Sequence, residues 1–254
     1  MSTLLKVSGV TKRFGGLQAL DHVDLEIQSG QIVGLIGPNG AGKTTFFNVL
    51  TGLYQADQGS FEFRGNQFNP KAVNEVVEIG VARTFQNIRL FGEMTVLENV
   101  MVGRHCRTRT GLLGAILKTQ KSCAEEKAIR EQSMNLLAYV GIERYADFTA
   151  KHLSYGHQRR LEIARALATD PLLLALDEPA AGMNSVEKSE LRILLEKIRA
   201  DGKTLLLIEH DVKLVMGLCD AITVLDYGKV IASGKPDDVR REPAVIQAYL
   251  GGSI

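Results

Sequence analysis

The stretch QIVGLIGPNGAGKTT, residues 31–45, decides the fold of this 254-residue chain. Residues 31–37 form a nearly continuous apolar run, which is typical of a strand that is covered on both faces. A glycine-rich turn follows, and residues 43–51 favour a helix. From Gly37 to Thr44 the turn matches the pattern G-x-x-x-x-G-K-[ST], in the strand–turn–helix context that a phosphate-binding loop requires.

Such a loop binds the phosphates of a nucleotide with its backbone and two side chains. Its glycines let the backbone wrap closely around phosphate oxygens, and the helix N-terminus adds a partial positive charge. Lys43 supplies a full charge to the β and γ phosphates, and Thr44 supplies a hydroxyl ligand to Mg²⁺. A glycine-rich turn without a ligand is the alternative, but the flanking strand and helix argue against it. We therefore predict that a nucleoside triphosphate is bound by Gly37, Pro38, Asn39, Gly40, Ala41, Gly42, Lys43, Thr44 and Thr45.

Buried strands alternate with helices along the chain, which predicts an α/β core with a mainly parallel sheet. Within residues 19–27 apolar and polar residues alternate, so the first strands should form an antiparallel edge layer. Residues 95–150 have helical character. We expect a single domain, 1–254, whose core (1–94 and 169–254) carries an inserted helical lobe at 95–168. Strands are expected at 4–10, 19–27, 31–37, 81–85, 172–176 and 205–208, around Phe61, and in two late segments around Ile222 and Val230; helices are expected at 43–51, 74–79 and 186–199.

The composition excludes several classes of protein. Apolar residues make up 45% of the chain and charged residues 23%, which is ordinary for a globular protein and argues against a disordered or fibrous chain. The 30 Lys and Arg residues balance 29 Asp and Glu residues, so no nucleic-acid partner is expected. The chain contains no apolar stretch long enough to span a bilayer. Its three scattered cysteines fit a reducing compartment, and we expect a cytoplasmic protein.

Polar residues follow three of the expected strands, at the edge where parallel sheets bind ligands. Asp177 comes directly after the strand 172–176 and is placed to hold Mg²⁺, directly or through water. Glu178 comes next and can orient or deprotonate the water that attacks the γ-phosphate. His210 follows the strand 205–208. Gln86 comes directly after the strand 81–85, where its amide can reach Mg²⁺ or the water. Taken alone, each residue would more simply be a strand end or a structural side chain.

The segment LSYGHQRR, residues 153–160, resembles the LSGGQ signature of the ATP-binding cassette (ABC) ATPases, and its order between Gln86 and Asp177 is also the family's order. The resemblance covers essentially the whole chain. It implies a P-loop NTPase with a RecA-like sheet, an antiparallel N-terminal β layer and an inserted α-helical lobe. It also implies that the nucleotide is ATP. The Asn-Lys-x-Asp motif by which GTPases recognise their base does not occur in the sequence. Phe14 resembles the aromatic residue that stacks on adenine, and the alternative for Phe14 is packing in the core.

The resemblance further implies a head-to-tail dimer, in which the signature of one subunit closes on the ATP of the other. Ser154 is a good N-cap, and the N-terminus of the helix that it begins is an anion site; a capped helix without a ligand is the alternative. Three positions depart from the family: Tyr155 replaces a glycine, His157 replaces the glutamine, and Asn184 replaces an aspartate. The signature residues are Leu153, Ser154, Tyr155, Gly156 and His157.

Several stretches resemble the ATPase subunits of branched-chain amino acid uptake systems: residues 83–87, 106–114, 153–156, 181–184 and 242–251. This resemblance implies import powered by ATP, with permease subunits in the membrane, a homologous second ATPase and, indirectly, a periplasmic solute-binding protein. A homodimer is possible in isolation, and the chain would lie on the inner face of the cell membrane. The alternatives are an ATPase for lipid or lipopolysaccharide export, a non-transport ABC ATPase acting on nucleic acid or ribosomes, and a regulator without turnover, against which Glu178 argues.

Residues 87–101 carry Leu90, Phe91 and Met94 close together in an expected surface segment. Clustered apolar residues on a surface favour an interaction groove for a partner, and the alternative is packing within the helical lobe. The family resemblance favours the interface, because the membrane subunit docks beside the glutamine loop.

Overall fold

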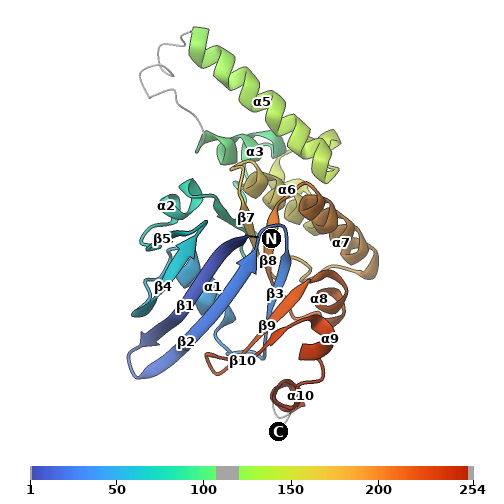
Figure 1. Ribbon diagram of the computed structural model, residues 1–254. Coiled ribbons are helices and arrows are strands. Elements are labelled where there is room, and N and C mark those ends of the chain that lie inside the picture. The colour runs from blue at the N-terminus through green and yellow to red at the C-terminus, as the bar shows by residue number, and fades with distance from the viewer. Residues whose placement is uncertain (1, 107–119, 251–254) are drawn as a thin grey trace. The chain divides into compact units, whose positions relative to one another are not determined.

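A computed structural model describes residues 2–106 and 120–250. The chain forms two compact units (Figure 1): unit 1 comprises Met1–Arg83 and Leu172–Ile254, and unit 2 comprises Thr84–Pro171. The lobe expected at residues 95–168 falls within unit 2. Most of the stretch 106–114, which resembles branched-chain transport ATPases, lies outside the described residues.

Unit 1 begins with an antiparallel sheet. Its strands are β1 (Thr3–Phe14), β2 (Leu17–Gln28), β4 (Gln58–Phe63) and β5 (Asn66–Phe68), in the order β2-β1-β4-β5. All three strand pairs are antiparallel. In β2 the side chains of Val23, Leu25 and Ile27 are buried and those between them are exposed. The expected antiparallel layer is thus confirmed.

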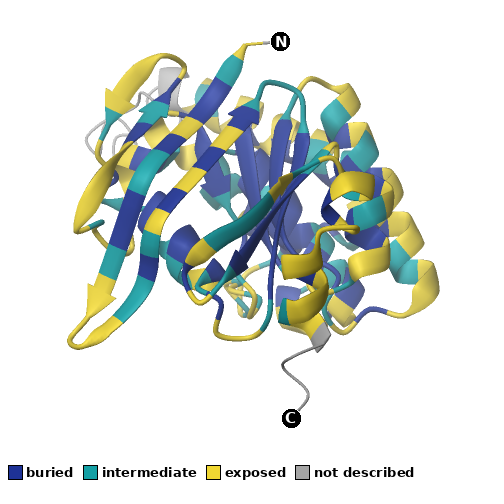
Figure 2. Cartoon of the chain, turned by 60° about the horizontal axis from the view of Figure 1, so that its bottom comes forward, coloured by how far each residue is buried: buried dark blue, intermediate teal, exposed yellow. Residues whose placement is uncertain are grey.

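The second sheet of unit 1 has six strands in the order β10-β9-β3-β8-β7-β6. They are β3 (Ile32–Ile36), β6 (Val81–Arg83), β7 (Leu173–Asp177), β8 (Thr204–Ile208), β9 (Ala221–Asp226) and β10 (Lys229–Gly234). All neighbours are parallel except β10, which pairs antiparallel with β9. Every residue of β3, β7 and β8 is buried (Figure 2), as the continuous apolar runs predict for strands covered on both faces.

One hydrophobic core joins the two sheets through helix α1 (Lys43–Leu50). Phe46 and Phe47 of α1 pack in the same cluster as Ile27 of β2 and Leu35 of β3. The phosphate loop connects β3 to α1, so a well-packed core fixes both of its ends.

Helices complete each unit. Unit 1 contains α2 (Val73–Glu78), α7 (Ser185–Ala200), α8 (Val212–Leu218), α9 (Pro236–Val239) and α10 (Pro243–Leu250). Unit 2 contains α3 (Val96–His105), α5 (Gln120–Val140), α6 (Tyr155–Leu167) and the short 3₁₀ helices η1 (Glu143–Tyr145) and η2 (Ala150–His152). Within the described ranges, no helix is both long and apolar enough to cross a membrane.

The strand expected at residues 81–85 is shorter in the structure, and this corrects the placement of Gln86. The ladder between β6 and β7 ends with the pair Arg83–Ala175, so Gln86 lies beyond the strand and within unit 2. Phe85 makes side-chain contacts instead: its N–H donates to Glu162 Oε1 at 3.2 Å, and its carbonyl accepts from Arg159 at 2.7 Å. These bonds replace the ladder bonds that a longer strand would make.

Candidate nucleotide-binding site

The phosphate loop adopts a backbone that requires glycine. Gly37 has φ 151° and Gly42 has φ 101°, both in the region that side chains disfavour. A Cβ atom at Gly37 would lie 2.0 Å from the carbonyl oxygen of Leu225, and one at Gly42 would lie 2.6 Å from that of Ala19. Gly42 is also the N-cap of α1, so the helix begins at Lys43 and its N-terminal amides face the loop.

Lys43 folds back over the loop that precedes it. Its Nζ donates to the carbonyl oxygens of Gly37 at 2.6 Å and Pro38 at 2.8 Å. Two of its three N–H groups are thus used, and the third can donate to a phosphate oxygen. Burial lowers the pKa of the Lys43 ammonium, and the nearby carboxylates of Glu178 and Asp177 raise it. The lysine and both predicted acidic residues therefore share one electrostatic environment in unit 1.

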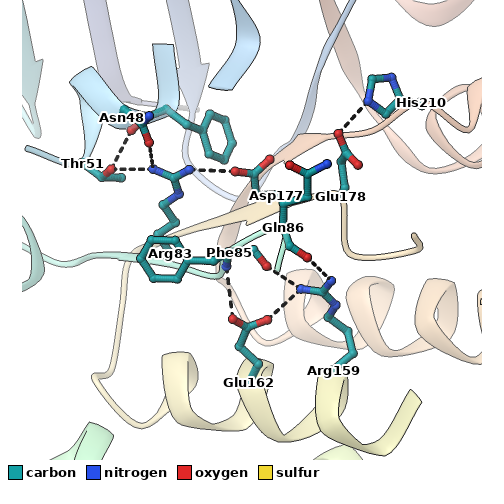
Figure 3. A network of polar contacts seen from close by, with 11 residues as sticks. Asn48, Thr51, Arg83, Phe85, Gln86, Arg159, Glu162, Asp177, Glu178 and His210 are labelled. Atoms are coloured by element: carbon teal, nitrogen blue, oxygen red, sulfur yellow. Dashed lines mark hydrogen bonds and ion pairs between the residues drawn. The ribbon is translucent and has the colours of Figure 1, made fainter. Parts of the chain in front are cut away.

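Asp177 is the last residue of β7, and only 1% of it is exposed. Arg83 NH2 donates to its Oδ2 at 2.7 Å, and NH1 of the same guanidinium donates to Asn48 Oδ1 on α1 at 2.7 Å (Figure 3). Asn48 follows Thr44 by four residues, so both lie on one face of α1. The carboxylate of Asp177 therefore lies on the side of α1 that carries the Thr44 hydroxyl.

These two oxygen donors fit Mg²⁺. The ion is usually bound in proteins by one or two side-chain oxygens together with substrate phosphates, rather than by a dedicated cage. Among the described residues, no three His, Cys, Asp or Glu side chains gather as a metal cage. Thr44 and Asp177 are the two predicted metal ligands of unit 1 and could hold the ion beside a bound triphosphate, whereas the third, Gln86, lies in unit 2.

Glu178 and His210 are brought together as a pair. Glu178 Oε1 and His210 Nε2 are joined by a hydrogen bond of 2.6 Å, in which the ring nitrogen donates when Glu178 is ionised (Figure 3). Glu178 has φ 48°, a left-handed conformation that costs a residue other than glycine about 1–3 kcal/mol. Its N–H donates to the carbonyl oxygen of Ile208 at 2.9 Å, which fixes this turn at the end of β7.

Glu209 is a buried carboxyl group whose role the sequence did not suggest. Its Oε1 accepts the N–H of Ala180 at 2.7 Å, and its Oε2 accepts the N–H of His210 at 3.2 Å. Burial raises the pKa of Glu209. Because Ala180 lies two residues after Glu178, Glu209 ties together the two loops that carry Glu178 and His210.

A cavity of about 880 Å³ is lined by the phosphate loop and by His210. Helix α10 lines another side of it through Ala244, Gln247, Ala248 and Tyr249. Tyr249 also forms a hydrogen bond with the backbone of Gly37, while burial raises the pKa of its phenol. The sequence indicated no contact between the end of the chain and the phosphate loop.

Phe14 lies at the end of β1 with 42% of its surface exposed, so the core alternative for this residue is wrong. Its ring packs edge-on against Tyr54, with ring centroids 5.3 Å apart. The Nζ of Lys12 lies 5.5 Å from the centre of the Phe14 ring. An exposed aromatic ring remains available for stacking on a base.

The signature residues lie in unit 2 at the start of α6. Ser154 is the N-cap, and its Oγ accepts the N–H of His157 at 3.4 Å. The hydroxyl also lies 3.1 Å from His157 Nδ1, and the His157 ring packs against Tyr145. Leu153 and Gly156 are buried. Ser154 therefore caps α6 as expected, and a helix N-terminus of this kind suits an anion.

Tyr155, which replaces a family glycine, belongs to a hydrogen-bond network within unit 2. Its hydroxyl accepts from Arg159 NH2 at 3.1 Å. Arg159 is completely buried, and it also donates to the carbonyl oxygens of Phe85 at 2.7 Å and Gln86 at 2.8 Å and to Glu162 at 2.7 Å (Figure 3). The signature helix and the backbone of the Gln86 loop are therefore held together by one guanidinium.

Asn184 is explained by its place at the start of α7. Its Oδ1 accepts the N–H groups of Val186 at 2.9 Å and Glu187 at 3.0 Å, and Glu187 bonds back to the N–H of Asn184 at 2.9 Å. This capping box uses the amide fully, and such caps stabilise a helix by about 1 kcal/mol.

Comparisons with known proteins agree with this arrangement. The sequence model of the ABC transporter family matches residues 20–181. The chain belongs to the ABC transporter family. ABC transporter ATPases bind ATP, so the nucleotide of the site is ATP. A second family model, described as branched-chain amino acid ATP-binding cassette transporter, matches residues 229–253, which include α10.

Relatives match nearly the whole length of this ABC ATPase. It is 46% identical over 249 residues to the high-affinity branched-chain amino acid transport ATP-binding protein LivG of Escherichia coli, covering 98% of each chain. The identity and the coverage are the same for the high-affinity branched-chain amino acid transport ATP-binding protein BraF of Pseudomonas aeruginosa. Among solved structures, the ADP conformation of the ABC transporter cassette MJ1267 superposes with a TM-score of 0.86 at 32% identity, covering 99% of this chain and 100% of that one.

Proposed function

We propose that this ABC ATPase hydrolyses ATP to power the import of branched-chain amino acids through permease subunits in the cell membrane. The observation that carries the proposal is the 46% identity over 98% of the chain to LivG and BraF. The match of residues 229–253 to the branched-chain family model supports it independently. In such an importer the permease and a periplasmic solute-binding protein would choose the solute, and this chain would supply the ATPase activity.

The residues of unit 1 would divide the work of hydrolysis. Lys43 and the loop amides bind the phosphates, and Phe14 stacks on adenine. Mg²⁺, held by Thr44 and Asp177, would neutralise charge on the β and γ phosphates. Glu178 orients or deprotonates the attacking water, and His210, bonded to Glu178 at 2.6 Å, senses the γ-phosphate.

Unit 2 carries the remaining residues to which we assign a role in hydrolysis or in contact with the membrane subunits. The amide of Gln86 would reach Mg²⁺ or the water, and the N-terminus of α6 at Ser154 would close on the ATP of a second ATPase subunit. That subunit would be a homologous chain in the transporter. Phe91 and Met94 are 49% and 38% exposed, and an exposed apolar surface beside Gln86 suits docking of a permease at the inner face of the membrane.

Replacement of Lys43 by alanine is expected to weaken ATP binding at least about tenfold, because the phosphates lose their main cationic partner. The comparison is made by calorimetry in the presence of Mg²⁺. Lys71→Ala, which removes an exposed lysine of the same unit, is the matched control and should bind ATP like the parent. Thermal unfolding of both variants reports the fold. Equal ATP affinity in Lys43→Ala and the parent would contradict the assignment of the phosphate loop.

The transport function is tested in the cell of origin by deleting the gene and restoring it as parent or as Lys43→Ala. We expect uptake of radiolabelled leucine, isoleucine and valine to fall in the deletion strain, to return with the parent and to stay low with the variant. Uptake of labelled lysine, a cationic solute, is the internal control and should not change. Normal uptake of all three branched-chain amino acids in the deletion strain would refute the proposal.

A further inference from the structure

The side chain of Arg83, at the end of β6, lies between Asp177 and helix α1. Its NH2 donates to Asp177 Oδ2 at 2.7 Å, and both side chains are nearly buried, with 7% and 2% exposed. Its NH1 donates to Asn48 Oδ1 at 2.7 Å and to Thr51 Oγ1 at 3.1 Å (Figure 3). The guanidinium also lies 5.4 Å from the centre of the Phe47 ring. Arg83 thus connects the helix of the phosphate loop to the end of β7.

A residue that Arg83 contacts on α1 is related to Thr44 by the helix period. Asn48 lies four residues after Thr44, so both belong to one face of α1, and Thr51 is the C-cap that follows the helix. A side chain that binds this face and Asp177 together fixes the distance between the carboxylate and the hydroxyl. Those are the two groups that would hold Mg²⁺.

We propose that Arg83 is a positioning residue for Mg²⁺: it holds the Asp177 carboxylate at the face of α1 that carries Thr44. The proposal rests on the proposed function in that it requires Mg²⁺ to bind with ATP. It assigns to Arg83 the metal-dependent part of ATP binding and leaves the phosphate contacts of Lys43 and the loop amides unchanged. A guanidinium suits this task, because its planar fork donates in two directions from fixed positions, whereas a lysine ammonium is a single flexible charge.

A buried arginine–carboxylate pair could also serve the fold alone, since loss of one partner leaves a buried charge uncompensated. The two roles differ in what they predict for ATP binding. A purely structural role changes stability, and changes ATP affinity equally with and without metal. The positioning role weakens ATP binding in Mg²⁺ and leaves it intact in EDTA.

The test measures ATP affinity by equilibrium dialysis with Mg²⁺ and with EDTA, in a Glu178→Gln background that prevents turnover. In Arg83→Lys we expect the affinity in EDTA to stay within about twofold of the parent and the affinity in Mg²⁺ to fall about tenfold, as for loss of a charge-assisted hydrogen bond. Asn48→Ala keeps Arg83 but removes one of its anchors, and should show a smaller loss of the same kind. Arg192→Lys, in an exposed pair with Glu196 on α7, is the matched control and should change neither affinity.

Three outcomes overturn the proposal: an unchanged affinity in Mg²⁺ for Arg83→Lys, a gain in Mg²⁺, or an equal loss in both solutions. A gain would show that Arg83 competes with the metal for Asp177. If Arg83→Lys fails to fold, as judged by circular dichroism, Asn48→Ala decides the question by the same criteria. A parent whose ATP affinity is the same in Mg²⁺ and EDTA would instead contradict the role given to Mg²⁺ in the proposed function.

Discussion

Replacement of Glu178 by glutamine is expected to lower the rate of ATP hydrolysis by a factor on the order of 10²–10⁴ while ATP still binds. Glutamine keeps the size of the side chain and can still bond with His210, which lies 2.6 Å from the carboxylate in the parent. It removes the negative charge that orients or deprotonates water. The left-handed backbone at residue 178 should persist, since the bond from its N–H to Ile208 does not involve the side chain.

Steady-state phosphate release measures the loss of turnover, and calorimetry measures ATP affinity. The control is Glu196→Gln, which neutralises a partly exposed glutamate of the same unit and should keep the parent's rate. We also expect Glu178→Gln to accumulate as an ATP-bound dimer, visible by light scattering, because the step that reopens the dimer is blocked. Unchanged turnover in Glu178→Gln would contradict the role of Glu178 in orienting or deprotonating water.

Clear apolar patterns explain why most of the fold could be predicted from the sequence. The apolar runs at β3, β7 and β8 have no polar interruptions, so they fit only strands covered on both faces. Asp177 and Glu178 could be located for the same reason, since the ends of neighbouring parallel strands meet at one edge of the sheet. The loop from Gly37 to Lys43 was recognisable from its glycine pattern, and a Cβ atom at Gly37 or Gly42 would collide with the backbone.

The residues that the sequence did not reveal act through contacts between distant positions. Arg83 and Asp177 are 94 positions apart, and an arginine at a strand end has no local pattern that names its partner. Glu209 stands between β8 and His210 in the sequence, and no local pattern there indicates that its buried carboxyl group accepts the N–H of Ala180. Tyr155 appeared only as a departure from the family, because its partner Arg159 lies on the next turn of α6 and reaches the backbone of Gln86.

Replacement of Ser154 by arginine is expected to abolish ATP-dependent dimerisation and turnover while ATP still binds to the monomer. In the proposed dimer, the N-terminus of α6 closes on the γ-phosphate held by Lys43 of the other subunit. An arginine places a long side chain where that phosphate would approach. Because Ser154 would face the ATP of the other subunit, binding of ATP to one chain's own phosphate loop should change little.

Light scattering with ATP, in a Glu178→Gln background, measures dimerisation. Ser154→Ala is the control, because it removes the capping hydroxyl without adding a bulky side chain. Alanine removes the hydroxyl that accepts the N–H of His157 and should cost the helix about 1 kcal/mol, but it leaves the approach to the amides open. Dimerisation should therefore weaken modestly in Ser154→Ala and disappear in Ser154→Arg. Without ATP, two phosphate loops and two helix N-termini would face each other with uncompensated positive ends, so the parent should be monomeric. Dimers that persist in Ser154→Arg would show that the α6 N-terminus does not contact the nucleotide of a second subunit.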